Sequence, residues 1–559
     1  MTERRKTSRF LIAGAAVLIA AAVLRMLAFS PGLEYDEIWT VRNYSARDLW
    51  TILNDLATPN NHPLNSLFVK WMLLFSDTAW SIRFPSFFAG LASVGLTGWL
   101  AVLLFRSRFA ALTAMIFVAA NPALILYSIT ARGYAVQTTL ILLYAVIAAL
   151  CYRYHRRLAL YLLPVCGFLA ELALPTSVLW LFPLSLVHCI AELLRGRKEW
   201  RRLLPLAVSY TVLGVILLFW LLFHYQDFKA GQSFGTAIAG VLPFFRDFLF
   251  PVWGAVCGWQ KYGVPLFLLI VLIALPFVGI AKRRLLLGLL VVLLFPFVCA
   301  VFTLAGPARV YLASVPFAAL ISGFLLVLMM RKVFRKRILL WLAPVSAVLL
   351  SGHFYVTGTP QWSRVDWIDR FELMKQIPAN RFLCVTATGA YPALWNNGEP
   401  IVRDYLARFH AVGERTELVQ LDQQGVINGM NPQGSEDTVS TGIKGKRVVA
   451  DGMELYSYRL QAYRGQGAPL LVFLRLDGIP AHYYTALISA LAAEPFVEKV
   501  LILNAFFVNA AQQTTRERLI YAIAALRIRN DLPSQARFRK FYTANQRKFD
   551  FFTLSGDSE

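Results

Sequence analysis

The stretch "FLIAGAAVLIAAAVLRMLAFSPGLEYDEIW" (10–39) joins about twenty mainly apolar residues to a short polar segment. A helix over 10–29 would cross a hydrocarbon core of roughly 30 Å at a rise of about 1.5 Å per residue. The apolar run exceeds the roughly 7–15 residues of a signal-peptide core, so we expect a retained membrane anchor. Just beyond it, Asp36 and Glu37 stand side by side among aromatic residues. The stretch therefore predicts a membrane helix that leads directly into a pair of acids at the membrane surface.

Apolar runs of similar length recur along the first 356 residues of the chain. Of the 559 residues, 57% are hydrophobic and only 16% are charged, whereas soluble proteins average about a quarter charged. This pattern predicts an α-helical polytopic membrane domain over 1–356, with long external loops at about 30–85 and 225–262. We expect about eleven transmembrane helices, over residues 10–29, 86–105, 109–128, 134–152, 158–174, 176–194, 203–224, 263–281, 285–304, 310–330 and 338–356.

The net charge of +23 is distributed in a way that orients the chain in a membrane. With the N-terminus in the cytoplasm, the basic clusters fall at the cytoplasmic ends of the predicted spans, and the opposite ends carry nearly balanced charge. This positive-inside pattern predicts an extracytoplasmic C-terminus. Because these loops show neither interleaved aromatic residues nor a compact patch, their charge does not indicate nucleic-acid binding. The clusters are Arg4–Arg5–Lys6–Arg9, Arg106/Arg108, Arg153/Arg156/Arg157, Arg195/Arg197/Lys198/Arg201/Arg202, Lys282–Arg283–Arg284 and Arg331/Lys332/Arg335/Lys336/Arg337.

The region 357–559 changes character and reads as an extracytoplasmic α/β domain, because predicted strands alternate with predicted helices. A polar, glycine-rich segment at 422–442 is typical of a loop. The region holds neither a glycine-rich phosphate motif after a strand nor a nucleophile elbow, so we expect it to serve structure or acceptor docking. The predicted strands are 381–389, 468–476 and 499–507, and the predicted helices are 367–377, 482–493 and 514–528.

The predicted topology places polar residues from distant loops together at the outer membrane face. Ionisable groups near membrane depth are costly and often functional, and helix bundles can bring such loop positions together. A structural alternative stays open, in which the acids begin a solvated helix and the arginines only anchor span ends. The six cysteines have no spacing that indicates a disulfide framework or a zinc site. The outer-face set is Asp36, Glu37, Asn60, Asn61, His62, Lys70, Arg83, Arg132, Tyr134, Arg246, Asp247, Arg309 and Tyr311.

Several motifs in this set resemble the GT-C superfamily of membrane glycosyltransferases. The similarity is greatest to the branch of bacterial protein O-mannosyltransferases and aminoarabinose transferases, and it covers about residues 10–330. The family's His-Pro-Pro is His62-Pro63-Leu64 here, and Val310 separates Arg309 from Tyr311. The resembling motifs are "YDEIWT" (35–40), "NNHPLNSLF" (60–68), "SIRFPSFFAGL" (81–91), "NPALILYSITARGYAVQTTLILLYA" (121–145), "GPARVYLASVPFAAL" (306–320) and "WSRVDWIDRFELMKQIP" (362–378).

This resemblance implies an enzyme of the bacterial plasma membrane that moves a sugar from a polyprenyl-phosphate donor to an acceptor at the outer face. The acceptor would be a glycolipid, a polysaccharide or a protein. Asp36 would be the general base, and Glu37 would orient it or help to bind a sugar or a metal ion such as Mg²⁺ or Mn²⁺. Phosphate binding is expected of Arg132, Arg309, His62, Lys70, Tyr134 and Tyr311, and substrate binding of Arg83 and Asn61.

Three other classes of protein fit parts of the sequence. A transporter or lipid flippase would need buried charges along an entire path, and it often has inverted repeats. Here the centres of nearly all predicted spans are apolar, and no repeat is detectable. A polysaccharide polymerase or ligase usually has a large external loop late in the series of spans, and a non-catalytic receptor would leave the outer-face charges without a purpose. We therefore favour the glycosyltransferase.

Overall fold

The computed structural model divides the chain into two compact units with a boundary between Ser363 and Arg364, near the predicted boundary after residue 356. In the first unit the structure describes residues 3–29, 35–56, 61–154, 157–194, 200–227, 238, 240–257, 263–302, 306–333 and 337–358. In the second it describes residues 382–387, 416–421, 437–438, 444–445, 470–475, 497–506 and 520–528, with single residues between 533 and 540.

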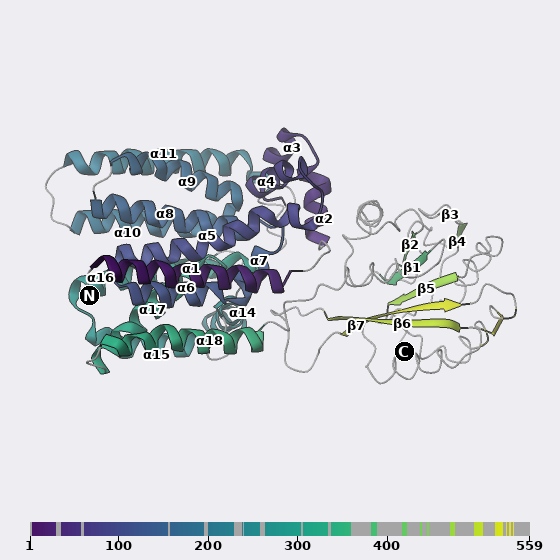
Figure 1. The fold of residues 1–559 in the computed structure, drawn as a ribbon. Helices are drawn as coiled ribbons and strands as arrows, with labels where there is room; N and C mark the ends of the chain where they lie inside the picture. Colours follow the sequence, from purple (N-terminus) through teal and green to yellow (C-terminus); the bar gives the residue numbers. More distant parts are fainter. Residues whose placement is uncertain are drawn as a thin grey trace. The chain divides into compact units, whose positions relative to one another are not determined.

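The first unit is a bundle of long helices, and Figure 1 shows them running side by side. Seven described helices are long and apolar enough to cross a membrane. They belong to α1 (Glu3–Leu27), α5 (Ala79–Phe105), α8 (Tyr134–Tyr154), α10 (Val178–Leu194), α11 (Trp200–Phe223), α16 (Ile280–Phe302) and α17 (Ser314–Val333).

The prediction of eleven spans is confirmed only in part, because seven described helices, or eight with one bent pair, are long and apolar enough to cross a membrane. An eighth span would be the pair α6 (Arg108–Ala119) and α7 (Pro122–Ser128), which bends by 64°. The bend has a local cause, because Pro122 disfavours a helical Asn121, whose side chain instead caps α7. The other three predicted spans are shorter apolar helices, and each adjoins a 3₁₀ turn: η2 (Pro175–Ser177), η5 (Leu275–Phe277) or η7 (Arg337–Trp341). They overlap α9 (Arg157–Ala173), α15 (Gly263–Ala274) and α18 (Leu342–Gly358).

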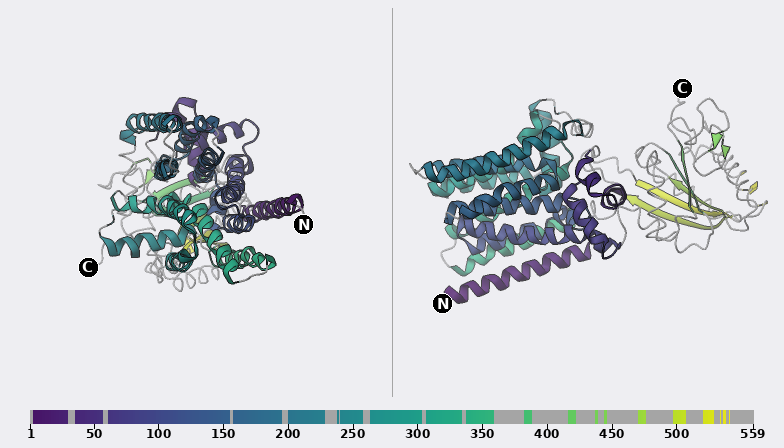
Figure 2. Two further views of the ribbon diagram at one scale, coloured as in Figure 1. Left: turned by 90° about the vertical axis from the view of Figure 1, so that its left-hand side faces the viewer. Right: turned by 90° about the horizontal axis from the view of Figure 1, so that it is seen from above.

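Small residues let the central helices approach closely. An added Cβ at Gly323 of α17 would lie 3.1 Å from the backbone of Ala110 and of Ala114 in α6, so α6 and α17 are in near backbone contact. This is the usual means of packing helices in lipid, where no hydrophobic force separates core from solvent. α1 instead lies along one edge of the bundle, as the right-hand view of Figure 2 shows. Only 17% of the most apolar 18-residue stretch of α1 is buried inside the protein.

Described residues in or beside three of the predicted basic clusters lie at one end of the bundle. Arg108 donates to Thr7 Oγ1 at 3.0 Å, and Arg153 donates to the Leu103 carbonyl at 3.2 Å. These contacts place the start of α1, the end of α5, the start of α6 and the end of α8 together. The candidate site lies at the opposite end, because α8 begins there with Tyr134. Which end faces the cytoplasm stays a prediction.

The two predicted external loops contain helices in the described residues. The first holds α2 (Tyr35–Thr40), the π-helix η1 (Val41–Ser45), α3 (Leu49–Asn54) and α4 (Pro63–Leu73), and α5 begins before it ends. The second holds α13 (Val241–Pro243), the π-helix η4 (Phe244–Leu249) and α14 (Phe250–Cys257). Asn121 ties α14 to the bundle, because its Nδ2 donates to the Val256 carbonyl at 2.9 Å.

The second unit contains a five-stranded sheet in the order β2-β1-β5-β7-β6. β1 (Phe382–Ala387) runs parallel to β2 (Thr416–Leu421) and β5 (Leu470–Arg475). β7 (Ile520–Ile528) is antiparallel to both β5 and β6 (Val497–Phe506). A further two-stranded ladder, β3 (Asp437–Thr438) and β4 (Lys444–Gly445), begins within the predicted loop at 422–442.

Three predicted strands are confirmed as β1, β5 and β6, but the helix predicted at 514–528 is wrong, because residues 520–528 form β7. β7 lies inside the sheet, between β5 and β6, where both faces of the sheet can be covered. A strand covered on both faces can be apolar throughout. Its sequence then lacks the alternation of a half-exposed strand and resembles that of a buried helix. The helices predicted at 367–377 and 482–493 lie outside the described residues, so the α/β class of this unit stays a prediction.

Candidate functional site

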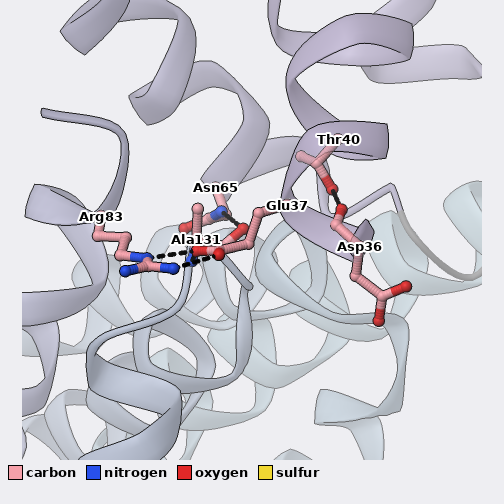
Figure 3. Close-up of polar contacts among 6 residues, drawn as sticks. All are labelled: Asp36, Glu37, Thr40, Asn65, Arg83 and Ala131. Carbon is pink, nitrogen blue, oxygen red and sulfur yellow. Dashed lines mark hydrogen bonds and ion pairs between the residues drawn. The ribbon is translucent and has the colours of Figure 1, made fainter. Parts of the chain in front are cut away.

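The short helix α2 sends its two neighbouring acids in different directions. Successive side chains on a helix are about 100° apart, so Asp36 and Glu37 cannot face the same partner. Thr40 Oγ1 donates to the backbone carbonyl of Asp36 at 2.9 Å. Figure 3 shows the Glu37 carboxylate between Arg83 and Ala131, and the Asp36 carboxylate pointing away from them.

Glu37 forms a closed, buried ion pair. Arg83 Nε donates to Oε1 at 2.7 Å and Arg83 Nη2 donates to Oε2 at 2.6 Å, so the guanidinium grips the carboxylate with two parallel bonds. The backbone N–H of Ala131 also donates to Oε1, at 2.6 Å. Both side chains are buried. With its oxygens held in this way, Glu37 joins α2 to α5 and to the loop before α8, and Arg83 serves the same junction.

Asp36 forms an open ion pair. Its Oδ2 lies 3.2 Å from Arg132 Nη1, and its side chain is 38% exposed, whereas the Arg132 side chain is buried. A carboxylate that can exchange protons with a bound molecule must be reachable, and of the two acids only Asp36 is exposed. The acid–arginine pairs at 36 and 37 are therefore different in kind.

The loop 129–133 is pinned by side chains from two other elements. Asn65 Nδ2 of α4 donates to the Ala131 carbonyl at 3.0 Å, and Ser86 Oγ of α5 donates to the Arg132 carbonyl at 3.2 Å. Gly133 completes the turn in a space that excludes a side chain. A Cβ there would lie 2.4 Å from the Ala173 carbonyl oxygen. Arg132 thus projects from a backbone that is fixed on several sides.

Tyr134 brings the two predicted phosphate-binding arginines to one place. Arg309, on the 3₁₀ helix η6 (Ala308–Tyr311), donates from Nε to the Tyr134 hydroxyl at 3.0 Å. The Arg132 guanidinium lies over the Tyr134 ring, 5.8 Å from its centroid. Tyr127 packs edge-on against the same ring, with centroids 4.8 Å apart. Residues 132 and 309, far apart in the sequence, therefore share one site.

His62 is buried beside these cations. Its ring meets the Tyr134 ring edge-on at 5.2 Å. Burial, reinforced by the positive charges of Arg132 and Arg309, holds the pKa of His62 well below its ordinary value of 6.5, and the Ala173 carbonyl opposes this shift only in part. The imidazole is therefore neutral at pH 7, and it can donate or accept a hydrogen bond without adding charge.

Three further residues that were predicted to bind substrate or phosphate have side chains that contact other residues of the chain. Asn61 Nδ2 donates to the carbonyls of Ile52 and Asp55, which fastens α3 to the start of α4. Lys70 Nζ donates to the Arg47 carbonyl at 2.6 Å. Tyr311 is buried in an aromatic cluster, stacked on Phe297 and edge-on to Phe248. Their predicted roles in binding stay predictions, and these contacts give each of them a structural function.

Sequence reasoning missed three residues of the site. Asn65 and Ser86, which hold the loop 129–133, and Tyr127, which packs on Tyr134, were not among the predicted site residues. A signal was present for the first two, since each is a polar residue near the start of a mainly apolar helix. Tyr127 could not be distinguished from the aromatic residues that commonly line membrane interfaces.

The charges at the site favour an anion. Among the described residues, the Glu37–Arg83 pair is neutral and closed, and Asp36 offsets part of the charge of both Arg132 and Arg309. Both arginines have a guanidinium fork that suits phosphate. Among the described residues, no three His, Cys, Asp or Glu side chains come together as metal ligands. The Glu37 oxygens accept from a cation and an N–H, so this residue does not fit the predicted alternative of a metal ligand.

Comparisons with known proteins give structural matches alone. No family model matches the chain, and no curated protein matches it. The solved structures similar to it include ArnT from Cupriavidus metallidurans in the apo state, with 14% identity, a TM-score of 0.46, and coverage of 93% of this chain and 98% of that one. They also include the same protein bound to undecaprenyl phosphate, with 13% identity, a TM-score of 0.49, and coverage of 95% and 99%.

Both matched structures are of an aminoarabinose transferase of the GT-C superfamily. This is the superfamily that the sequence motifs resemble. Because both TM-scores lie below 0.5, we derive the chemistry of the site from its own residues.

Proposed function

We propose that this chain is an integral membrane glycosyltransferase that moves a sugar from a polyprenyl-phosphate donor to an acceptor hydroxyl at the outer membrane face. One observation carries the proposal. Arg132 and Arg309 meet at Tyr134, beside one half-exposed carboxylate, at the end of a bundle of apolar helices. Such a site suits a lipid with an anionic head, whose chain lies among the helices and whose phosphate lies at the arginines.

The arginines would hold the phosphate before and after transfer. As the bond between the sugar and the phosphate breaks, negative charge collects on the departing phosphate. Guanidinium groups placed where this charge develops stabilise the transition state more than the ground state. The Tyr134 hydroxyl accepts from Arg309, so its own proton is available to a phosphate oxygen. Neutral His62 could supply a further hydrogen bond.

Asp36 would act on the acceptor. Its carboxylate would take the proton of an acceptor hydroxyl while that oxygen attacks the anomeric carbon, and the carbon–oxygen bond to the phosphate would break. The products are a glycosylated acceptor, a polyprenyl phosphate and a protonated Asp36, which then loses its proton to water. Its exposure and its place beside Arg132 suit this role. Glu37 would fix the orientation of Asp36 through its closed pair with Arg83.

The acceptor class and the sugar follow from an experiment on cells. Mass spectrometry of envelope glycans and glycolipids, with and without the protein, should reveal one missing sugar. That sugar, linked to polyprenyl phosphate, is then supplied to the purified protein in proteoliposomes. Transfer to the acceptor, at a rate that depends on Asp36, supports the proposal. Movement of intact lipid-linked sugar across the bilayer without transfer would instead favour the flippase alternative.

A further inference from the structure

A buried arginine lies outside the site described above. Arg25, near the end of α1, has a fully buried side chain although α1 lies at the edge of the bundle. Its Nη1 donates to the Ala21 carbonyl at 3.0 Å and to the Ala119 carbonyl at 3.2 Å. No ion pair of Arg25 is found in the described part of the chain, and its Nε and Nη2 have no hydrogen-bond partner there. Such a cation is costly to bury, so a stabilising role does not explain it.

The contact with Ala119 falls at the break between α6 and α7. Ala119 is the last residue of α6, and the helix direction changes by 64° before α7 begins. The last carbonyls of a helix lack partners within the helix and carry partial negative charge. A guanidinium at this place satisfies one of these carbonyls and opposes their charge. Arg25 therefore fixes the end of α6 from the side of α1.

The far side of the break is fixed as well. Asn121 Oδ1 caps α7 by accepting from the Leu124 N–H at 2.9 Å, while its Nδ2 binds the Val256 carbonyl. At the other end of α7, Ser128 packs against Gly90 of α5 so closely that a Cβ on Gly90 would lie 2.0 Å from Ser128 Oγ and 3.2 Å from Arg25 Nε. The Arg25 guanidinium therefore lies near both ends of α7: it bonds the Ala119 carbonyl before α7 begins and lies beside Gly90 where α7 ends.

We propose that Arg25 is a positioning residue, which holds the α6–α7 break so that α7 presents Arg132 to the donor phosphate. This inference rests on the proposed function. Only three residues lie between Arg132 and the end of α7, which has 7 residues, so α7 supports the Arg132 loop from one side while Asn65 and Ser86 hold it from the others. Displacements of about 1 Å at a site can reduce rates by about 100-fold.

The experiment measures binding of undecaprenyl phosphate to the full-length protein in nanodiscs, with undecaprenol as the uncharged control. Arg25→Met should weaken phosphate-dependent binding by about 10-fold, as expected when one charge-assisted hydrogen bond is misplaced. Arg25→Lys, which keeps the charge and one donor, should lose less. In an Arg132→Ala background, Arg25→Met should have no further effect on binding, because it acts through Arg132.

Arg153→Met is the matched control. Arg153 also donates to carbonyls near a helix end, those of Val102 and Leu103 in α5, but it lies at the opposite end of α8 from Tyr134. We expect it to lower the thermal midpoint without changing phosphate binding. Arg25 variants that fold and bind undecaprenyl phosphate as wild type does would overturn the inference, as would additive effects of Arg25→Met and Arg132→Ala. If Arg25→Met does not fold, Arg25→Lys decides between these outcomes. Failure of the wild-type protein to prefer undecaprenyl phosphate would instead count against the proposed function itself.

Discussion

Two acid–arginine pairs begin at neighbouring residues and differ in the exposure of the acid and in the hydrogen bonds that hold it. Glu37 and Arg83 are buried and share two hydrogen bonds, and the Ala131 N–H donates a further bond to Glu37. Asp36 Oδ2 lies 3.2 Å from Arg132 Nη1, and the Asp36 carboxylate is 38% exposed. The closed pair holds three elements together, whereas the open pair leaves the Asp36 carboxylate within reach of a bound molecule. Burial and saturation, more than residue type, distinguish a structural ion pair from a reactive one.

The largest expected effect is on the open pair. Asp36→Asn keeps the size of the side chain but removes the proton acceptor, so sugar transfer should fall by about 10²–10⁴-fold, the usual contribution of a general base. Binding of polyprenyl phosphate should persist, and the thermal midpoint should stay within a few degrees because a half-exposed acid buries little apolar area. The measurement is the transfer rate in proteoliposomes, with Asp48→Asn, an exposed helix cap of α3, as the control. Wild-type transfer by Asp36→Asn would remove this residue from the mechanism.

Changes at Arg132 and Arg309 should affect phosphate binding, whereas changes at the Arg83 pair should affect stability first. Arg132→Ala and Arg309→Ala should each weaken undecaprenyl phosphate binding by about 10- to 100-fold, because each loses a charge-assisted contact. Arg132→Lys should bind better than Arg132→Ala and worse than wild type, since lysine keeps the charge but lacks the fork. Titrations in nanodiscs check this. Equal binding by all three proteins would make Arg132 only an anchor.

The closed pair should respond in stability first. Glu37→Gln leaves the Arg83 charge buried without its partner, and breaking such a pair costs about 3–5 kcal/mol. The double variant Glu37→Gln with Arg83→Met should regain part of this loss, because no unpaired charge remains. Thermal and denaturant unfolding in detergent measure both. A stable Glu37→Gln protein that has lost transfer as fully as Asp36→Asn would show that Glu37 takes part in the chemistry. In that case, adding EDTA would show whether Glu37 acts through a metal ion. We expect EDTA to leave the transfer rate unchanged.

The smallest expected effect is on the stability of the protein at low pH. The pKa of His62 in the folded protein is lowered by burial and by the charges of Arg132 and Arg309, so the unfolded chain binds its proton more readily. His62 therefore contributes stability that is present above the ordinary value of 6.5 and is lost as pH falls below it. His62→Gln should flatten the fall of the thermal midpoint below this pH. An unchanged slope would mean that other groups govern the acid sensitivity.

Much of the fold could be predicted because apolar periodicity and charge asymmetry are local properties of the chain. All eleven predicted segments carry helices, and described residues of three basic clusters lie at one end of the bundle. The lengths of α9, α15 and α18 and the strand β7 could not be predicted, because prolines and strand neighbours decide them. At the site, the sequence predicted that residues 36, 132 and 309 would meet. It could not predict that Glu37 would face Arg83, because that depends on the rotation of α2 against α5.

The contrast between the two pairs is tested most directly by chemical rescue of sugar transfer. In Asp36→Ala the lost carboxylate is replaced by an opening that solvent can reach, so added formate can enter and accept the proton. In Glu37→Ala the position is buried, and an added base cannot restore a lost structural junction. We predict that formate raises the transfer rate of Asp36→Ala in a concentration-dependent way, whereas the Glu37→Ala rate does not respond. Rescue of Glu37→Ala, with none for Asp36→Ala, would contradict the assignment of chemistry to the open pair.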